Sequence, residues 1–381
     1  MSDNYNINLA ALSRFTSNQA GLIHALARGK NWSGGPPKAP SLNDGTGLIF
    51  VTKPDFNLSS ANVGHHRRFS PLLTSDRLSM GALIRDGLDP RSVHQSGVPH
   101  SALNDPLNPF FSILDNTATS LDGWPDYVME TYSSKAGPRG SQHGMYTGSI
   151  KDAMQFPLTS THRNLPGDVI NHIITYWQLW GDYVHHWKVS PHRINVINDR
   201  LDYASRWYRF AFDNTGQRVN QFTMCGYCYP ISGNQGAVMG YSTDSNRNQG
   251  YDEITIQWDS YGVFHNDPII IDEFNRTVSN FNPLMLDVNR ENFMTKLGGV
   301  THGSISHAAP FTGYGYPRIN PRTMEFEIWV PNNQYSLIIN DTSLEEAKLA
   351  IQRKTDEDFN RAFARLTPEE RAVLYGTQEI G

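Results

Sequence analysis

The strongest periodic signal in the chain is an apolar stripe between residues 168 and 187. Large apolar side chains recur there every three or four residues, which is the spacing of one helix face. They are Val169, Ile170, Ile173, Ile174, Trp177, Trp180, Val184 and Trp187. Pro166 and Gly167 precede the run and Ser190-Pro191 end it, so the pattern predicts a helix over 168–187. Burying its three tryptophans would stabilise the fold by several kcal/mol, so we expect this helix to pack on a large apolar surface.

A β-hairpin is predicted directly after this helix, within Leu201–Pro230. Residues 206–212 and 218–229 are rich in β-favouring side chains, and they flank the turn-forming Asp213-Asn214-Thr215-Gly216. Both faces of this aromatic ribbon carry large side chains, so we expect the 168–187 helix to cover one face and another domain or subunit the other. A sugar-binding platform is the functional alternative. The aromatic residues are Trp207, Tyr208, Phe210, Phe212, Phe222, Tyr227 and Tyr229.

Two further hairpins are predicted downstream. In Glu253–Trp258 apolar and polar residues alternate as in a half-buried strand; a turn over Asp259–Gly262 and a strand over Val263–Ile271 would follow. Alternation also marks Met324–Val330, which a Pro-Asn-Asn turn would join to Tyr335–Ile339. Three such pairs predict an antiparallel sheet or sandwich.

The first 165 residues show less regularity. The pattern allows a helix over Leu9–Arg28, an arm over the Gly- and Pro-rich Gly29–Gly47, and a short strand over Leu48–Thr52. Between residues 56 and 165 few segments are periodic; Asp86–Val98 reads as loop, and the Gly-rich Lys135–Gly148 as a mobile loop. Either the periodicity misses real elements here, or neighbours in an assembly hold the segment in place.

The expected fold class is therefore α+β: an antiparallel β-sheet core with a long packed helix, an extended N-terminal arm and a helical C-terminal tail. Capping signatures such as Ser343 with Glu346 predict the helical tail. The division that follows is an N-terminal arm and irregular region over 1–165, an α+β core over 166–340, and the tail over 341–381.

Composition narrows the function. The net charge of −5 argues against a general nucleic-acid binder, which needs a basic surface. No apolar run approaches the roughly 20 residues that span a bilayer, and residues 1–12 lack the features of a secretory signal. Two cysteines cannot form a disulfide framework. We expect a soluble protein made in the cytoplasm, whose low hydrophobic fraction of 38% suits burial of loops against partners.

The Cys225-Gly226-Tyr227-Cys228 tetrapeptide is the one pattern that is typical of an active site, a redox C-x-x-C. Its flanking residues favour a strand rather than the helix N-terminus that activates such a thiolate. In a regular strand, positions three apart point to opposite faces, so the two sulfurs should not meet.

Other candidate chemistry is sparse. The histidine pairs 65–66 and 185–186 are poorly spaced for one metal ion, as are His172 and His186; His302 and His307 could line a loop pocket. The acid pairs Asp252-Glu253 and Asp272-Glu273 flank predicted strand ends, where acids are usually solvated. The motifs of serine hydrolases, P-loop proteins, dinucleotide-binding proteins and zinc proteases are absent. We predict no catalytic, cofactor-binding or metal-binding residues, no cofactor, and no enzyme activity.

Several stretches resemble virion structural proteins of large tailed bacteriophages. The stretches are Leu48–Leu58, Leu201–Phe212, Cys225-Gly226 with Tyr229-Pro230-Ile231, and Asn266–Asn275 with Asn282-Pro283. The resemblance implies a component of a contractile tail, at the baseplate or the start of the tail tube. It also implies partners: other tail proteins and further copies of the chain around a six-fold axis, in a virion assembled from proteins made in the host cytoplasm. The alternatives are a collar, neck or sheath-attached protein, and a carbohydrate-binding or carbohydrate-cleaving tail protein.

Overall fold

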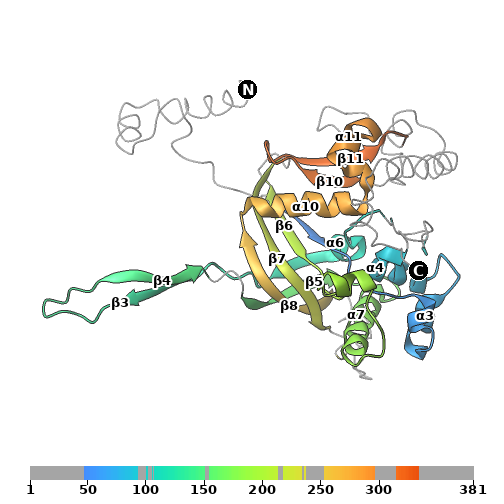
Figure 1. The fold of residues 1–381 in the computed structure, drawn as a ribbon, viewed down its shortest axis with the longest axis horizontal. Helices are drawn as coiled ribbons and strands as arrows, with labels where there is room; N and C mark the ends of the chain where they lie inside the picture. Colours follow the sequence, from blue (N-terminus) through green and yellow to red (C-terminus); the bar gives the residue numbers. More distant parts are fainter. Residues whose placement is uncertain are drawn as a thin grey trace, which may run out of the picture. The chain divides into compact units, whose positions relative to one another are not determined.

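Six strands form the central sheet of the computed structural model, and every neighbouring pair is antiparallel (Figure 1). The structure describes residues 47–333 apart from 93–99, 102–104, 106, 151–153, 213–217, 234–235, 237–252 and 297–314. The strands lie across the sheet in the order β1 (Gly47–Val51), β6 (Trp207–Phe212), β7 (Val219–Ser232), β8 (Glu253–His265), β5 (Gln155–Arg163) and β2 (Ala118–Asp122). This mixture of helix with a mostly antiparallel sheet confirms the predicted mixed class.

The first predicted strand and the first predicted hairpin are confirmed. β1 occupies the strand predicted over 48–52, and β6 and β7 are the antiparallel strands of the aromatic ribbon. The turn between them lies outside the described residues. Adjacent side chains enter opposite faces: Trp207 belongs to one hydrophobic cluster, and Tyr208 to another. The alternation predicted for β8 also holds, because Ile254, Ile256 and Trp258 are fully buried.

The turn predicted over Asp259–Gly262 is wrong, because β8 continues through it as one strand to His265. The strand lies between β5 and β7 and pairs with both of them there. Gly262 takes a φ of 70°, which glycine adopts without strain, and the pairing with β7 keeps the same register on both sides of it. The strand predicted up to Ile271 is also wrong. Asp267 accepts a hydrogen bond from the Ile269 amide, and Pro268 opens helix α10 (Pro268–Phe281).

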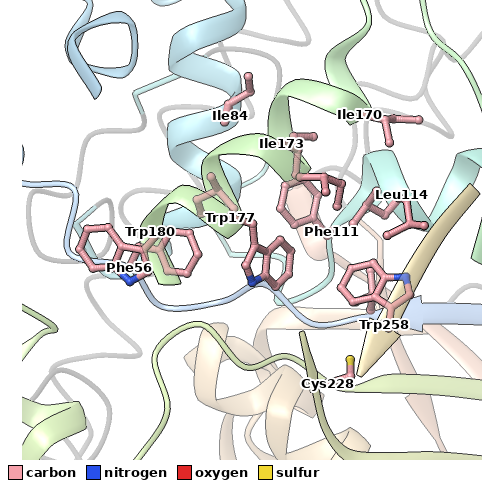
Figure 2. Close-up of a cluster of buried hydrophobic side chains, with 14 of the residues drawn as sticks. Phe56, Ile84, Phe111, Leu114, Ile170, Ile173, Trp177, Trp180, Cys228 and Trp258 are labelled. Carbon is pink, nitrogen blue, oxygen red and sulfur yellow. The ribbon is translucent and has the colours of Figure 1, made fainter. Parts of the chain in front are cut away.

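One face of the sheet is covered by α7 (Val169–His185), in the segment predicted as a helix over 168–187. Trp177 and Trp180 from this helix are buried among side chains from the sheet and from earlier helices (Figure 2). Trp177 meets Trp258 edge to face at 5.6 Å, and Trp180 stacks on Phe56 at 5.0 Å. The earlier elements on this face are α3 (Ser60–Val63), η2 (Arg67–Leu73), α4 (Met80–Leu88) and α6 (Ser112–Thr117).

Trp187 does not share this burial, although the sequence pattern included it in the stripe. It is 93% exposed. The helix ends at His185, and Trp187 takes a left-handed φ of 57°, so the helical period no longer sets the direction of its side chain.

The opposite face carries a second hydrophobic cluster, which packs β6 and β7 against α10. This face is covered by elements of the same chain, where the sequence predicted another domain or subunit. Strand β11 (Phe326–Pro331) confirms the strand predicted over 324–330, and its neighbours are β10 (Tyr316–Ile319) and β9 (Met294–Lys296). The return strand predicted over 335–339 lies outside the described residues. The covering elements are α10, η3 (Pro283–Met285), α11 (Asp287–Phe293), β9 (Met294–Lys296), β10 (Tyr316–Ile319) and β11 (Phe326–Pro331).

The segment 56–165 holds several elements that its periodicity did not indicate. The loop predicted over Asp86–Val98 is wrong at its start, because α4 runs to Leu88. The loop predicted over Lys135–Gly148 includes the start of β4 (Gly144–Ile150), which pairs with β3 (Met129–Ser133). The first of the two alternatives therefore applies to the elements that pack on the chain's own sheet and core, whereas the β3–β4 hairpin lies outside the six-stranded sheet.

The predicted boundary at residue 165 falls between β5 and α7, whose side chains share one hydrophobic cluster. Most of the predicted N-terminal arm and the whole C-terminal tail lie outside the described residues, so the helices proposed for 9–28 and 341–381 stay predictions. Within the part of the chain that the structure describes, none of the helices has the length and apolarity needed to cross a bilayer.

Two glycines in helices provide a matched test of the packing around α4. A Cβ atom on Gly81 would overlap the carbonyl oxygen of Pro71, whereas one on Gly181 in α7 would meet nothing within 4 Å. We expect Gly81→Ala to lower the free energy of unfolding by about 1–3 kcal/mol, because backbone must move. Gly181→Ala should raise it by about 0.5–1 kcal/mol, because alanine favours the helix. Urea unfolding measures both; equal effects would contradict the packing.

Candidate assembly surfaces

The histidines and acids singled out in the sequence do not converge. His185 and His186 are exposed neighbours with ring centroids 5.3 Å apart, and His65 is exposed. Glu273 is occupied in ion pairs with Arg206 and Arg276. Asp252, His302 and His307 lie outside the described residues. Among the residues that are described, no three His, Cys, Asp or Glu side chains are grouped as a metal site would require.

The two cysteines lie on the same face, which corrects the prediction from a regular strand. Both are fully buried in the cluster beneath α7. Tyr208 pairs with Met224 and Ser205 with Cys228, so β7 has one residue more than the opposing stretch. Such a bulge changes which face the following side chains take. Burial raises the pKa of the Cys228 thiol, and the neighbouring Cys225 raises it further, so this thiol keeps its proton.

The aromatic ribbon offers no open platform for a sugar. Trp207, Tyr208 and Phe210 are fully buried, and Phe212 and Phe222 nearly so. Tyr227 and Tyr229 are half-buried: Tyr227 stacks on Tyr261, and the Tyr229 hydroxyl donates to Asp259 at 2.8 Å. The ribbon is core, and its side chains hold the sheet between its two covering layers.

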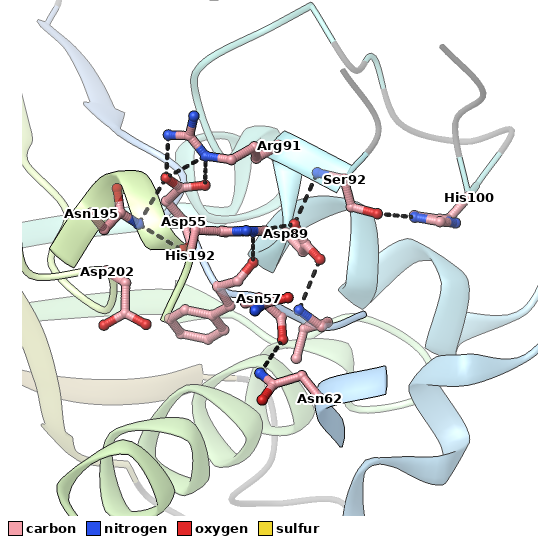
Figure 3. Close-up of polar contacts among 12 residues, drawn as sticks. Asp55, Asn57, Asn62, Asp89, Arg91, Ser92, His100, His192, Asn195 and Asp202 are labelled. Atoms are coloured by element: carbon pink, nitrogen blue, oxygen red, sulfur yellow. Dashed lines mark hydrogen bonds and ion pairs between the residues drawn. The ribbon is translucent and has the colours of Figure 1, made fainter. Parts of the chain in front are cut away.

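A polar network lies beside α7 and ties three distant parts of the chain together (Figure 3). Asp89, at the end of α4, is fully buried and accepts hydrogen bonds from the backbone amides of Leu58 and Ser92 at 2.9 and 3.0 Å. His192 Nε2 lies 3.3 Å from the same carboxylate. Asp55 accepts from Arg91 and, at 2.9 Å, from the Asn195 amide. The network fixes the segment around residue 55 against α8 (Arg193–Ile197).

Titratable groups in this region are shifted by their surroundings. Burial alone would lower the pKa of His192, but the hydrogen bond and charge of Asp89 outweigh it, so the pKa is raised. Burial raises the pKa of Asp202 to about 6 against the opposing hydrogen bond from Trp180 Nε1. Burial also lowers the pKa of Lys53 to about 8, although carboxylates including Asp105 oppose it. These three groups are packed inside the protein, which suits a role in stabilising the fold.

Exposed apolar side chains, in contrast, gather at two places. Seventeen large apolar side chains are exposed in the described part of the chain, and ten of them fall in two short stretches. Scattered exposed apolar residues are normal, but concentrated ones mark contact sites. Six belong to the first stretch, Tyr127, Val128, Met129, Tyr132, Met145 and Tyr146, and four to the second, Trp187, Val196, Ile197 and Leu201.

The first stretch is the β3–β4 hairpin, whose strands pair with each other outside the six-stranded sheet (Figure 1). Tyr132 lies directly opposite Met145, and Thr131 opposite Tyr146, so each face of the ribbon carries an exposed aromatic ring. A two-stranded ribbon alone in water is only marginally stable. Its base is anchored, because the Tyr127 hydroxyl accepts a hydrogen bond from the His265 amide at 2.8 Å.

The second stretch, which we call the Trp187 surface, comprises residues 187–201. It was missed in the sequence because the helical stripe placed Trp187 inside. The hairpin was missed because its glycines resemble a loop. A signal existed, since short runs with tyrosine and threonine flank a Gly- and Ser-rich turn, as in other hairpins.

A family model described as "Putative phage tail tube protein" matches residues 16–345. A search of curated proteins finds no match.

Three solved structures are similar to parts of this chain, and two of them come from an extracellular contractile injection system. The cap of the anti-feeding prophage, which terminates the tube of that prophage, is 15% identical to this chain. The match covers 39% of this chain and 79% of the cap, with a TM-score of 0.24. The sheath/tube terminator of the extracellular contractile injection system PVC is 12% identical to this chain. The match covers 39% of this chain and 85% of the terminator, with a TM-score of 0.22. A chain of the PVC sheath–tube complex is 13% identical to this chain. The match covers 39% of this chain and 80% of that one, with a TM-score of 0.22. TM-scores this low establish no shared fold.

Proposed function

Since this chain belongs to the family of phage tail tube proteins, we propose that it is a structural component of a contractile tail. Its position in the particle is the baseplate or the start of the tail tube, and it acts through assembly contacts. Its partners are other tail proteins and further copies of itself, arranged around a six-fold axis. It works in the virion after synthesis in the host cytoplasm, without a cofactor or catalytic residues.

The observation that carries this proposal is the exposed β3–β4 hairpin. Tyr132 and Met145 are 56% and 65% exposed, and they lie side by side on one face of the ribbon. Burying this face would stabilise both the hairpin and the contact. Repetition around a closed ring lets such modest contacts add up to a stable particle.

The test is a double variant, Tyr132→Ser with Met145→Ser. We expect it to raise the protein concentration at which rings form about tenfold or more, because it removes the apolar face of the contact. Its free energy of unfolding should change little, since both side chains are exposed. Mass photometry over a concentration series, with the other tail proteins present, measures the assembly.

The matched control is Val288→Ser, an 80% exposed position on α11 away from the hairpin. It should assemble as the unaltered chain does. If the unaltered chain enters no particle, alone or with the other tail proteins, the proposed function is wrong. If the double variant assembles normally, the hairpin is not the contact.

A further inference from the structure

The Trp187 surface is built with its polar side inward. In an ordinary surface helix the apolar residues are buried, but α8 buries Asn195, while Val196 and Ile197 are 60% and 62% exposed. Leu201 follows at 48% and Trp187 precedes at 93%. A chain segment that turns apolar groups to water loses free energy in the isolated protein, and this loss is recovered when a partner covers them.

The inner side of the segment is held by hydrogen bonds, which makes the surface rigid before any partner arrives. The Ser190 carbonyl accepts from Asn62 at 2.9 Å, and the Ser190 amide donates to the Asn62 side chain at 3.0 Å. Asn195 is bound to Asp55 (Figure 3). Preorganised surfaces bind with a smaller entropic cost.

Trp187 itself is held in an uncommon conformation. Its φ of 57° is a region that non-glycine residues seldom adopt, and such strain tends to gather at functional sites. Tryptophan is also among the residues that contribute most to protein interfaces. A nearly fully exposed tryptophan on a fixed segment is therefore suited to be the central contact of an interface.

We infer that the Trp187 surface receives the β3 side of the hairpin from a neighbouring copy of the chain; the inference rests on the proposed function. A ring needs two different complementary surfaces on each subunit. The described part of the chain has two concentrations of exposed apolar residues, and these are the hairpin and the Trp187 surface.

Charge supports the same pairing. The β3 side of the hairpin, Asp126–Tyr132, carries two carboxylates, Asp126 and Glu130, and no basic residue, whereas the hairpin's exposed cations, Lys135 and Arg139, lie beyond β3 in the turn. The Trp187 surface carries three exposed cationic side chains and one exposed carboxylate, Asp199. The cationic residues are Lys188, Arg193 and Arg200. Opposite charges at the rim would steer and orient the two surfaces, whose apolar residues form the centre.

The test is disulfide cross-linking between two differently tagged variants, Val128→Cys and Ile197→Cys, mixed under conditions in which the unaltered chain assembles. The two natural cysteines are the chain's only others, and both are fully buried, so the introduced thiols are the accessible ones. We expect disulfides between the two variants to exceed either like-with-like product about tenfold or more. Val288→Cys is the matched control and should give no preferred partner.

Three results would overturn the inference. Dominant Val128→Cys pairs would mean that hairpin meets hairpin. Particles without the mixed disulfide would mean that another protein covers the Trp187 surface, while the proposed function stands. A chain that never assembles would contradict both the inference and the proposed function. As an independent arm, Trp187→Ala should raise the concentration needed for assembly about tenfold with unchanged urea unfolding; normal assembly of this variant would also count against the pairing.

Discussion

Trp177→Ala is expected to lower the free energy of unfolding by about 3–5 kcal/mol, the cost typical of removing a large buried aromatic side chain. Trp177 is 1% exposed and lies between α7 and the sheet. Its ring meets Trp258 and Phe56 edge to face, and its Nε1 donates to the Tyr203 carbonyl at 2.7 Å. Alanine would leave a cavity at the junction and the Tyr203 carbonyl without this donor.

Urea unfolding followed by circular dichroism measures the loss. Trp187→Ala is the matched control, because it removes the same side chain from a 93% exposed position near the same helix. It should change the free energy of unfolding by less than about 0.5 kcal/mol. Equal losses in the two variants would contradict the packing of α7 on the sheet.

This contrast between two tryptophans shows where the helical repeat predicts burial of a side chain and where it does not. The 3.6-residue repeat places Trp177 in the core because the segment stays helical around it. It fails at Trp187, where the helix has ended and one left-handed backbone angle decides the direction of the side chain. Sequence spacing contains no record of that angle, so exposure at helix ends cannot be read from the stripe.

The turn predicted over Asp259–Gly262 and the strand predicted up to Ile271 are wrong for another reason. The run Val263–Ile271 has short apolar stretches at both ends, and such stretches suit a buried strand and a buried helix equally. The decisive signal was Asp267-Pro268, an N-cap followed by proline at the first helical position. The continuity of β8 through Asp259 depends on its pairing with β5 and β7, which are distant in sequence.

The candidate surfaces were hidden for a related reason. The hairpin's contact residues, Tyr132 and Met145, are defined by pairing across a Gly-rich stretch, and only the register reveals that they share a face. α8 has its polar residue inside because Asn195 meets Asp55, which lies 140 positions earlier in the chain. Local pattern predicts elements well where burial follows a single period, and poorly where long-range hydrogen bonds reverse it.

The long-range network itself leads to the second large effect. Asp89→Ala is expected to lower the free energy of unfolding by about 3–5 kcal/mol, as in other cases where one member of a buried charged pair is removed. Asp89 is fully buried, and alanine would leave the Leu58 and Ser92 amides without their acceptor. The control is Asp76→Ala, which removes one exposed hydrogen bond to the Leu78 amide and should cost less than about 1 kcal/mol.

The loss should depend on pH, which separates the network from a simple packing defect. Asp89 raises the pKa of His192 above its ordinary 6.5. A raised pKa means that the folded protein holds this proton more tightly than the unfolded chain does. The stabilisation is therefore complete below pH 6.5 and is lost as the pH rises through the folded-state pKa. Urea unfolding of the unaltered chain and of Asp89→Ala should differ more at acidic than at alkaline pH. A difference that is constant with pH would show that His192 gains no charge interaction from Asp89.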